Sequence, residues 1–120
     1  MVRVLIIDDS PIVFKMIRRA LEPNGFEIAG HAENGKIGLE MYEKLKPDII
    51  TLDVTMPIMD GMETAQNLFR MNPDVKVIML SAMGDDDLLN AAKKIGVRYF
   101  HPKPINPQEL VSLINKVLNK

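Results

Sequence analysis

The chain has 120 residues, of which 47% are apolar and 26% are charged, and its formal net charge is −1. A chain of this length fits one ordinary domain, so residues 1–120 are expected to form a single domain with no second, output domain beside it. The near-zero net charge excludes a bulk attraction for nucleic acid or an anionic membrane, and the absence of cysteine excludes a disulfide, a thiolate zinc site and a cysteine nucleophile.

The first apolar run, VRVLII at 2–7, is predicted as a β-strand and meets Asp8 at once. It contains only one basic residue, and it is too short for the apolar region of a signal peptide or for a membrane span. Together with the absence of cysteine, which suits a reducing compartment, this predicts a cytoplasmic protein.

Four further apolar runs are predicted as strands, at 26–32, 48–52, 75–80 and 97–102. The runs at 48–52 and 75–80, like the first, consist almost entirely of β-forming residues, which is typical of central parallel strands that helices cover on both faces. The run at 26–32 alternates in character, and the run at 97–102 carries Pro102, which a strand tolerates mainly at a sheet edge. We expect these two runs to be the edge strands.

Segments with helical periodicity follow the strands, and the first three begin with N-cap signals. Ser10, followed by Pro11, begins a helix that is predicted over about 12–22 and that Pro-Asn-Gly at 23–25 ends. Similar signals begin the second and third helices, at Asn34-Gly35 and Asp60-Gly61.

The two remaining helices differ in their apolar faces. The fourth, predicted from about Asp85 to Ile95, has a thin apolar stripe, so it is expected to pack weakly and to be able to move. The fifth has five apolar residues at amphipathic spacing, namely Leu110, Leu113, Ile114, Val117 and Leu118.

Strands that alternate with helices in this way predict an α/β fold, a doubly wound five-stranded parallel sheet of flavodoxin-like type with helices on both faces. With the second and fifth strands outside, the simplest strand order is 2-1-3-4-5, although edge composition alone leaves the inner order open. In this order the topological switch point, where such folds bind ligands, lies between the first and third strands. Asp8, Asp9 and Asp53 follow these two strands.

Three carboxylates at one mouth of a sheet repel each other unless a cation lies among them. Mg²⁺ suits such a site because it binds a few carboxylates, retains some waters and leaves positions for phosphate oxygens, whereas Ca²⁺ requires more protein oxygens. Ser81 at the fourth strand adds a hydroxyl, and Lys103 adds an ammonium within HPKPINP at 101–107, where three prolines restrict the backbone. The sequence therefore predicts an acidic half that binds metal and a donor half that binds an anion.

At these positions the chain resembles response-regulator receiver domains. The resemblance covers the whole chain and depends on four motifs, which are Asp8-Asp9, Asp53 within TLDVTMPIMDG, Ser81-Ala82 and Lys103-Pro104. Each motif alone is unspecific, but their order at successive strand ends is specific. With SAMG at 81–84, the chain is most similar to the single-domain receivers of chemotaxis; the alternative is a receiver domain cut from a longer response regulator with a transcriptional or enzymatic output.

The resemblance implies a phosphoryl-accepting switch of a two-component system. It implies that Asp53 accepts a phosphoryl group from a histidine kinase and that Mg²⁺ is the cofactor. Asp9 would bind Mg²⁺ directly and Asp8 largely through water, and Asp53 and the backbone carbonyl of Thr55 would complete the protein ligands. The domain would catalyse only its own phosphorylation and dephosphorylation, without turnover of an external substrate.

The resemblance also implies how the switch works. Lys103 and Ser81 would each bind a phosphoryl oxygen, and Ser81 would move inward with residues 82–84, so that the aromatic ring of Phe100 could swing in. The bond between Lys103 and Pro104 would be cis. The fourth helix, fifth strand and fifth helix would form the face that controls a downstream protein partner, and the domain would act as a monomer, without direct nucleic-acid contact or membrane insertion.

Parts of the sequence also resemble proteins with other functions. LDVT superficially resembles the aspartyl-nucleophile motif of haloacid-dehalogenase-like phosphatases, but Thr55 stands where that motif needs a second Asp. A nucleotide-binding module lacks a GxxxxGK[ST] or GxGxxG motif after a strand. The last alternative to the phosphorylated switch is an unphosphorylated adaptor with the receiver fold.

Several residues also have simpler explanations. The role of Asp8, Asp9 and Ser10 could be merely to cap the first helix. Lys103 could simply extend from an edge strand toward water. Two methionines, Met56 and Met83, flank the crevice and could tune the access of water to a phosphoryl group.

A structural role is also favoured for His31 and His101, with His101 kept as a possible partner contact. Pro102 removes a strand donor and is expected to shorten the fifth strand.

Overall fold

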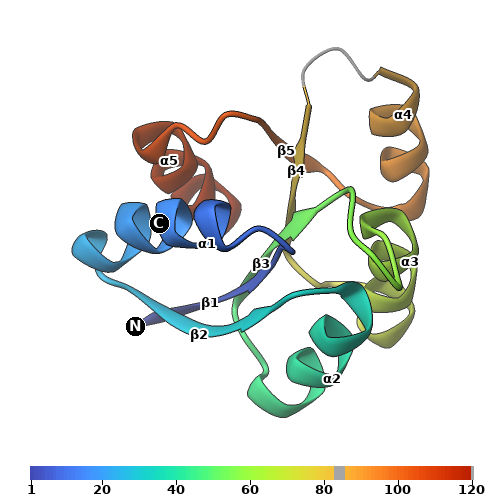
Figure 1. Ribbon diagram of the computed structural model, residues 1–120, viewed down its shortest axis with the longest axis horizontal. Coiled ribbons are helices and arrows are strands. Elements are labelled where there is room, and N and C mark those ends of the chain that lie inside the picture. Colours follow the sequence, from blue (N-terminus) through green and yellow to red (C-terminus); the bar gives the residue numbers. More distant parts are fainter. Residues whose placement is uncertain (83–85, 120) are drawn as a thin grey trace.

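Strands and helices alternate along the chain in a computed structural model that describes residues 1–82 and 86–119 (Figure 1). The strands are β1 (Val2–Ile7), β2 (Phe26–Ala32), β3 (Ile49–Asp53), β4 (Val77–Ser81) and β5 (Tyr99–Pro102). The helices are α1 (Pro11–Leu21), the short 3₁₀ turn η1 (Glu22–Asn24), α2 (Gly35–Leu45), α3 (Gly61–Met71), α4 (Asp86–Ile95) and α5 (Pro107–Val117).

The strands form one parallel sheet in the order β2-β1-β3-β4-β5, so the predicted fold and strand order are confirmed. Helices α1 and α5 cover one face of this sheet, and α2, α3 and α4 cover the other (Figure 1). Successive residues of a strand point to opposite faces. In β1, Val4 and Ile6 are therefore buried under α1 and α5, while Leu5 and Ile7 are buried on the other side, which explains the unbroken apolar run.

The predicted N-caps of the first three helices are confirmed. The side chains of Ser10, Asn34 and Asp60 each accept a hydrogen bond from the backbone N–H three residues further on, at 3.2, 2.9 and 2.9 Å. Each cap satisfies one of the N–H groups that a first helical turn leaves without a partner. The caps thus fix the residue at which each of these helices begins.

Strands β4 and β5 begin two residues later than predicted, at Val77 and Tyr99. The backbone N–H of Val75 donates to the carbonyl of Asn72, and the N–H of Val97 donates to the carbonyl of Ala92, at 3.0 and 3.1 Å. The first bond closes the turn after α3 and the second ends α4, so these donors are not available to a sheet ladder. At the other end, β3 includes Asp53 and β4 includes Ser81.

Three further expectations concern the part of the chain from α4 onward. Helix α4 buries Ala92 alone among its described residues, as the thin apolar stripe predicted, and its expected first residue, Asp85, lies outside the described residues together with Met83. Strand β5 is only four residues long and ends at Pro102, as expected. His101 is 3% exposed, so its structural role is confirmed and the idea that its side chain contacts a partner is wrong.

No helix within residues 1–82 and 86–119 has the length and apolar character needed to cross a membrane.

Candidate functional site

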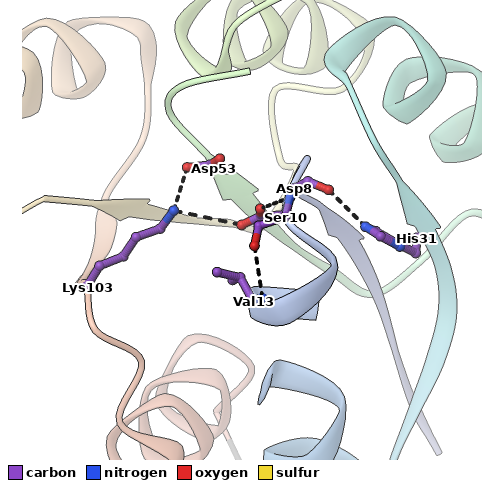
Figure 2. A network of polar contacts seen from close by, with 6 residues as sticks. All are labelled: Asp8, Ser10, Val13, His31, Asp53 and Lys103. Atoms are coloured by element: carbon purple, nitrogen blue, oxygen red, sulfur yellow. Dashed lines mark hydrogen bonds and ion pairs between the residues drawn. The ribbon is translucent and has the colours of Figure 1, made fainter. Parts of the chain in front are cut away.

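The side chains singled out in the sequence lie at the carboxyl edge of the parallel sheet. Asp8 follows β1, Asp53 ends β3, Ser81 ends β4, and Lys103 follows β5 directly. Because parallel strands all end at the same edge, residues that are far apart in the chain converge there. Figure 2 shows Asp8, Asp53 and Lys103 pointing toward one another from three separate segments.

Three carboxylates form an acidic cluster at this edge. Asp8, Asp9 and Asp53 each provide an oxygen, and these oxygens lie within 4.8 Å of one another. Asp8 is completely buried and Asp53 is 5% exposed, whereas Asp9 is exposed. The cluster therefore has two buried members and one that faces solvent.

Lys103 is the cation that balances part of this charge. Its Nζ lies 2.8 Å from Oδ1 of Asp53 and 3.9 Å from Oδ2 of Asp8 (Figure 2). Its backbone N–H donates to the carbonyl of Ser81 at 2.8 Å, and its peptide bond with Pro104 is cis, as the resemblance implied. The backbone of Lys103 is thus tied to β4 while its side chain reaches across to β3.

Within the described part of the chain, one of the two side-chain oxygens of Asp8 has no hydrogen-bond partner. Oδ1 accepts a hydrogen bond from the backbone N–H of Ser10 at 2.8 Å, but Oδ2 is buried and has no hydrogen-bond partner among the described residues. Burial raises the pKa of Asp8, and the charges of Asp53 and Asp9 raise this pKa further, while the Ser10 N–H and Lys103 lower it. A buried anionic oxygen without a donor is costly.

The donor set fits a hard divalent cation. Carboxylate oxygens of three residues converge, Oδ2 of Asp8 is buried without a hydrogen-bond partner among the described residues, and Lys103 compensates only part of the charge. Oxygen-only ligands of this kind, few in number, match Mg²⁺ better than softer metals.

His31 contacts the site although it lies outside the sequence-predicted set of site residues, and Phe14 packs on His31 in turn. His31 on β2 lies with Nε2 2.8 Å from the backbone carbonyl oxygen of Asp8 (Figure 2). Its ring stacks on Phe14 of α1, with centroids 4.0 Å apart and planes 3° from parallel. The sequence assigned His31 only a structural role. The only feature of the sequence that could have indicated a contact with the site is the position of His31 near the carboxyl end of an edge strand, which pairs with β1.

The remaining predicted residues lie around the cluster rather than in it. Thr55 is exposed two residues after Asp53, and Ser81 is 6% exposed at the end of β4. Phe100 is half-buried on the α4 side of the sheet, paired across the ladder with Met79, and the Nζ of Lys93 lies 6.0 Å from its ring centroid. The structure therefore brings together the carboxylates and Lys103. Phe100 instead packs on the apolar cluster between the sheet and the helices α2, α3 and α4.

Known proteins resemble this chain in sequence and in fold. A sequence model of the response regulator receiver domain matches residues 4–115. The chemotaxis protein CheY of Thermotoga maritima is 40% identical over 115 residues, covering 96% of each chain, and CheY of Bacillus subtilis is 38% identical over 117 residues, covering 98% of each.

Solved structures of CheY proteins also resemble this chain in fold. A chain of the CheX-CheY-BeF3-Mg²⁺ complex from Borrelia burgdorferi superimposes with a TM-score of 0.93 at 31% identity, covering 99% of this chain and 90% of that one. The chemotaxis protein CheY4 of Vibrio cholerae gives a TM-score of 0.91 at 28% identity, covering 98% of both chains.

Proposed function

The chain belongs to the response regulator receiver domain family, whose members related to CheY are phosphoacceptor signalling switches, and we propose that Asp53 is its phosphoacceptor. The observation that carries this proposal is the position of Asp53. Its carboxylate ends the central strand β3, bonds to Lys103 at 2.8 Å and shares an oxygen cluster with Asp8 and Asp9. The donor is a phosphohistidine of a partner kinase.

The proposed transfer forms one bond and breaks one. A carboxylate oxygen of Asp53 attacks phosphorus, the phosphorus–nitrogen bond to the imidazole breaks, and the imidazole nitrogen leaves with the electron pair. Catalysis of such a transfer consists mainly of positioning and of neutralising charge on the equatorial oxygens. Lys103 supplies an ammonium for one oxygen and the hydroxyl of Ser81 donates to another.

The proposed cofactor is Mg²⁺, held by Asp8, Asp9, Asp53 and the backbone carbonyl of Thr55. The buried Oδ2 of Asp8, which has no hydrogen-bond partner in the described part of the chain, and the converging carboxylates support this ligand set. When bound, the ion would supply positive charge for the third phosphoryl oxygen and would reduce the repulsion between the carboxylates.

The proposed output couples Asp53 to the face formed by α4, β5 and α5. Ser81 and Met79 lie on the same face of β4, and Met79 pairs with Phe100 on β5. Inward movement of Ser81 toward a phosphoryl group would gain a charge-assisted hydrogen bond and would change the packing beside Phe100. Phosphorylation would then shift an existing equilibrium of this face.

We also propose the domain organisation, oligomeric state, location and partner of the chain from its membership of the receiver family. The described chain acts as one domain and a monomer in the cytoplasm, controls a downstream protein on the α4-β5-α5 face, and turns over no external substrate. Chemotaxis is the proposed process, because CheY relatives of 40% and 38% identity carry that designation.

Intact mass spectrometry tests the phosphoacceptor directly. The protein is incubated with acetyl phosphate or phosphoramidate, with and without Mg²⁺, as wild type and as Asp53→Asn. We expect one phosphoryl adduct that requires Mg²⁺ and is absent from the variant.

Asp60→Asn is the matched control, since Asp60 is a nearby carboxylate that only caps α3. It should retain the adduct. A wild type that stays unmodified under every donor would instead favour an unphosphorylated adaptor, and an adduct that persists in Asp53→Asn would place the acceptor elsewhere.

A further inference from the structure

We propose that His31 is a positioning residue of the metal site, which fixes the peptide between Asp8 and Asp9 through a hydrogen bond to the Asp8 carbonyl. This inference rests on the proposed Mg²⁺-dependent function. It concerns a residue that takes no part in the chemistry itself and that contacts the acidic cluster only through the backbone.

The backbone of Asp8 is held on both sides of its α-carbon. Its N–H donates to the carbonyl of Ala32 at 2.9 Å, and its carbonyl accepts from Nε2 of His31 at 2.8 Å. A carbonyl oxygen can only accept, so Nε2 must carry the proton. The side-chain Oδ1 of Asp8 is held as well, by the N–H of Ser10. Oδ2 is buried without a hydrogen-bond partner among the described residues, and the Nζ of Lys103 lies 3.9 Å from it.

The carbonyl of Asp8 also sets the orientation of Asp9. Lys103–Pro104 is the only cis peptide bond within residues 1–82 and 86–119, so the Asp8–Asp9 peptide is trans and planar. Its N–H therefore points away from β2 when its carbonyl points toward His31. Rotation about the Cα–C bond of Asp8, which turns this carbonyl, would also move the starting point of the Asp9 side chain relative to the Asp8 carboxylate.

The ring of His31 is itself held in place. It stacks on Phe14 at 4.0 Å between centroids, and the guanidinium carbon of Arg18, one turn further along α1, lies 5.6 Å from the centroid of Phe14. Phe14 packs in turn on the apolar layer under α1. A donor that is already ordered loses little rotamer entropy when the site must be rigid, which is the advantage of a preorganised supporting shell.

A simpler role would be that His31 only satisfies a carbonyl at the end of the β1–β2 ladder. That role predicts a loss of stability and no change in metal affinity. The positioning role predicts a loss of metal affinity, because outer-shell partners of metal ligands typically contribute about 10–100-fold.

The test compares four variants of the whole chain in the absence of any phosphodonor. His31→Ala removes the donor, His31→Gln keeps an N–H donor without the ring, and Phe14→Leu keeps His31 without its stacking partner. Ile28→Ala is the matched control, since Ile28 is also half-buried on β2 and packs on the α1 side without a contact to Asp8. Mg²⁺ affinity is measured by calorimetric titration, and unfolding free energy by urea.

We expect His31→Ala to raise the Mg²⁺ dissociation constant about tenfold or more. His31→Gln should recover most of the affinity, and Phe14→Leu should fall between. Ile28→Ala should lose stability with an unchanged dissociation constant. Wild-type affinity in His31→Ala would overturn the proposal, as would equal losses in His31→Ala and His31→Gln.

A second measurement is independent of metal. The amide of Ser10 is protected by Oδ1 of Asp8, so its hydrogen exchange reports on whether Asp8 is held. We expect faster exchange of this amide in metal-free His31→Ala and not in Ile28→Ala, and unchanged exchange would contradict the positioning role. If wild type bound no Mg²⁺, the proposed cofactor would be wrong, and the exchange experiment would still decide whether His31 fixes Asp8.

Discussion

The carboxylate of Asp8 combines a charge with complete burial, and this has a consequence for stability. Because the pKa of Asp8 is raised above its ordinary value of 3.8, the folded state binds a proton more tightly than the unfolded state does. The contribution of Asp8 to stability therefore decreases as pH rises through the raised pKa. Without a metal, ionisation of this buried side chain therefore destabilises the fold.

Asp8→Asn is expected to stabilise the metal-free protein and to remove its response to Mg²⁺. The amide removes a buried charge that Asp53 and Asp9 repel, so the free energy of unfolding at pH 7 should rise by roughly 1 kcal/mol. Wild type should gain about 1.4 kcal/mol at ten times the dissociation constant of Mg²⁺, and the variant should gain none. Thermal unfolding with and without Mg²⁺ measures both effects; a variant less stable than metal-free wild type would contradict the argument.

Ile58 carries backbone strain in the segment that follows the candidate phosphoacceptor. Its φ is 70°, and the N–H of Met59 donates back to the carbonyl of Pro57 at 2.7 Å around it. A β-branched residue rarely adopts positive φ, whereas Asn adopts it more readily. Ile58 is also 78% exposed, so little apolar burial opposes this strain.

We expect Ile58→Asn to raise the free energy of unfolding by about 1 kcal/mol, since a non-glycine residue at positive φ costs roughly 1–2 kcal/mol. Ile12→Asn is the control, because Ile12 is 71% exposed in α1 without unusual backbone angles. That change should be neutral or slightly destabilising. Equal effects of the two substitutions in urea unfolding would show that surface hydrophobicity, and not φ, is responsible.

At the scale of elements, the N-terminus of α3 packs directly on the backbone that follows β3. The N–H of Gly61 donates to the carbonyl of Val54 at 2.7 Å. A Cβ at Gly61 would lie 2.2 Å from the carbonyl oxygen of Asp53 and 2.7 Å from the Cα of Val54. These are backbone atoms, which cannot move aside without displacing the end of β3.

Gly61→Ala is therefore expected to lower the free energy of unfolding by about 1–3 kcal/mol, the usual cost of overpacking. Gly30→Ala is the matched control on β2, since its Cβ would meet only the side-chain ends of Leu45, Met41 and Leu5, at 3.0 Å or more. The control should lose less stability in chemical denaturation. The explanation fails if Gly30→Ala is as destabilised as Gly61→Ala.

Helices α4 and α5 differ in how firmly they are attached to the sheet. Helix α5 buries Leu110, Ile114 and Val117, while α4 buries only Ala92 among its described residues. Local opening depends on how much apolar contact must be broken, so the mid-helix amides of α4 should exchange hydrogen roughly tenfold faster than those of α5. Native-state exchange followed by NMR measures this. Equal protection would remove the physical basis for α4 as the mobile part of the output face.

At the scale of the whole molecule, the sequence predicted most of the sheet because each strand carries its own signal. Uniform apolar runs marked β1, β3 and β4 as central, and Pro102 marked β5 as an edge. The carboxylates and Lys103 were predictable as well, because parallel strands place their carboxyl ends together.

Contacts between elements could not be predicted in the same way. The stacking of His31 on Phe14 and the burial of His101 depend on how α1 and α5 pack on the sheet, and neither residue belongs to a periodic pattern. The late starts of β4 and β5 also depend on helix-end hydrogen bonds that no apolar run reveals. The positive φ of Ile58 is equally invisible, since a β-branched residue rarely adopts it.

The burial of His101 links the stability of the entire domain to pH. The backbone N–H of Asn106 donates to Nε2 of His101 at 3.1 Å, so the ring bridges β5 and the start of α5 across the segment that carries Lys103. Protonation of Nε2 would break this bond and would place a cation in a buried site. Burial accordingly lowers the pKa of His101 from 6.5, although the charge of Glu109 opposes this shift.

The sign of the pH effect follows from this lowered pKa. Below pH 6.5 the unfolded state takes up a proton at His101 before the folded state does, so stability is complete above that pH and decreases as pH falls toward the lowered value. One such proton gives a slope of at most about 1.4 kcal/mol per pH unit. His101→Gln keeps an acceptor for the Asn106 N–H without a titrating group. The unfolding free energy of both proteins is measured in urea between roughly pH 7.5 and 5, and the difference between the two proteins cancels the contributions of the carboxylates, which both share. As pH falls, this difference should change in favour of the variant. Parallel curves for the two proteins would mean that His101 titrates alike in the folded and unfolded states.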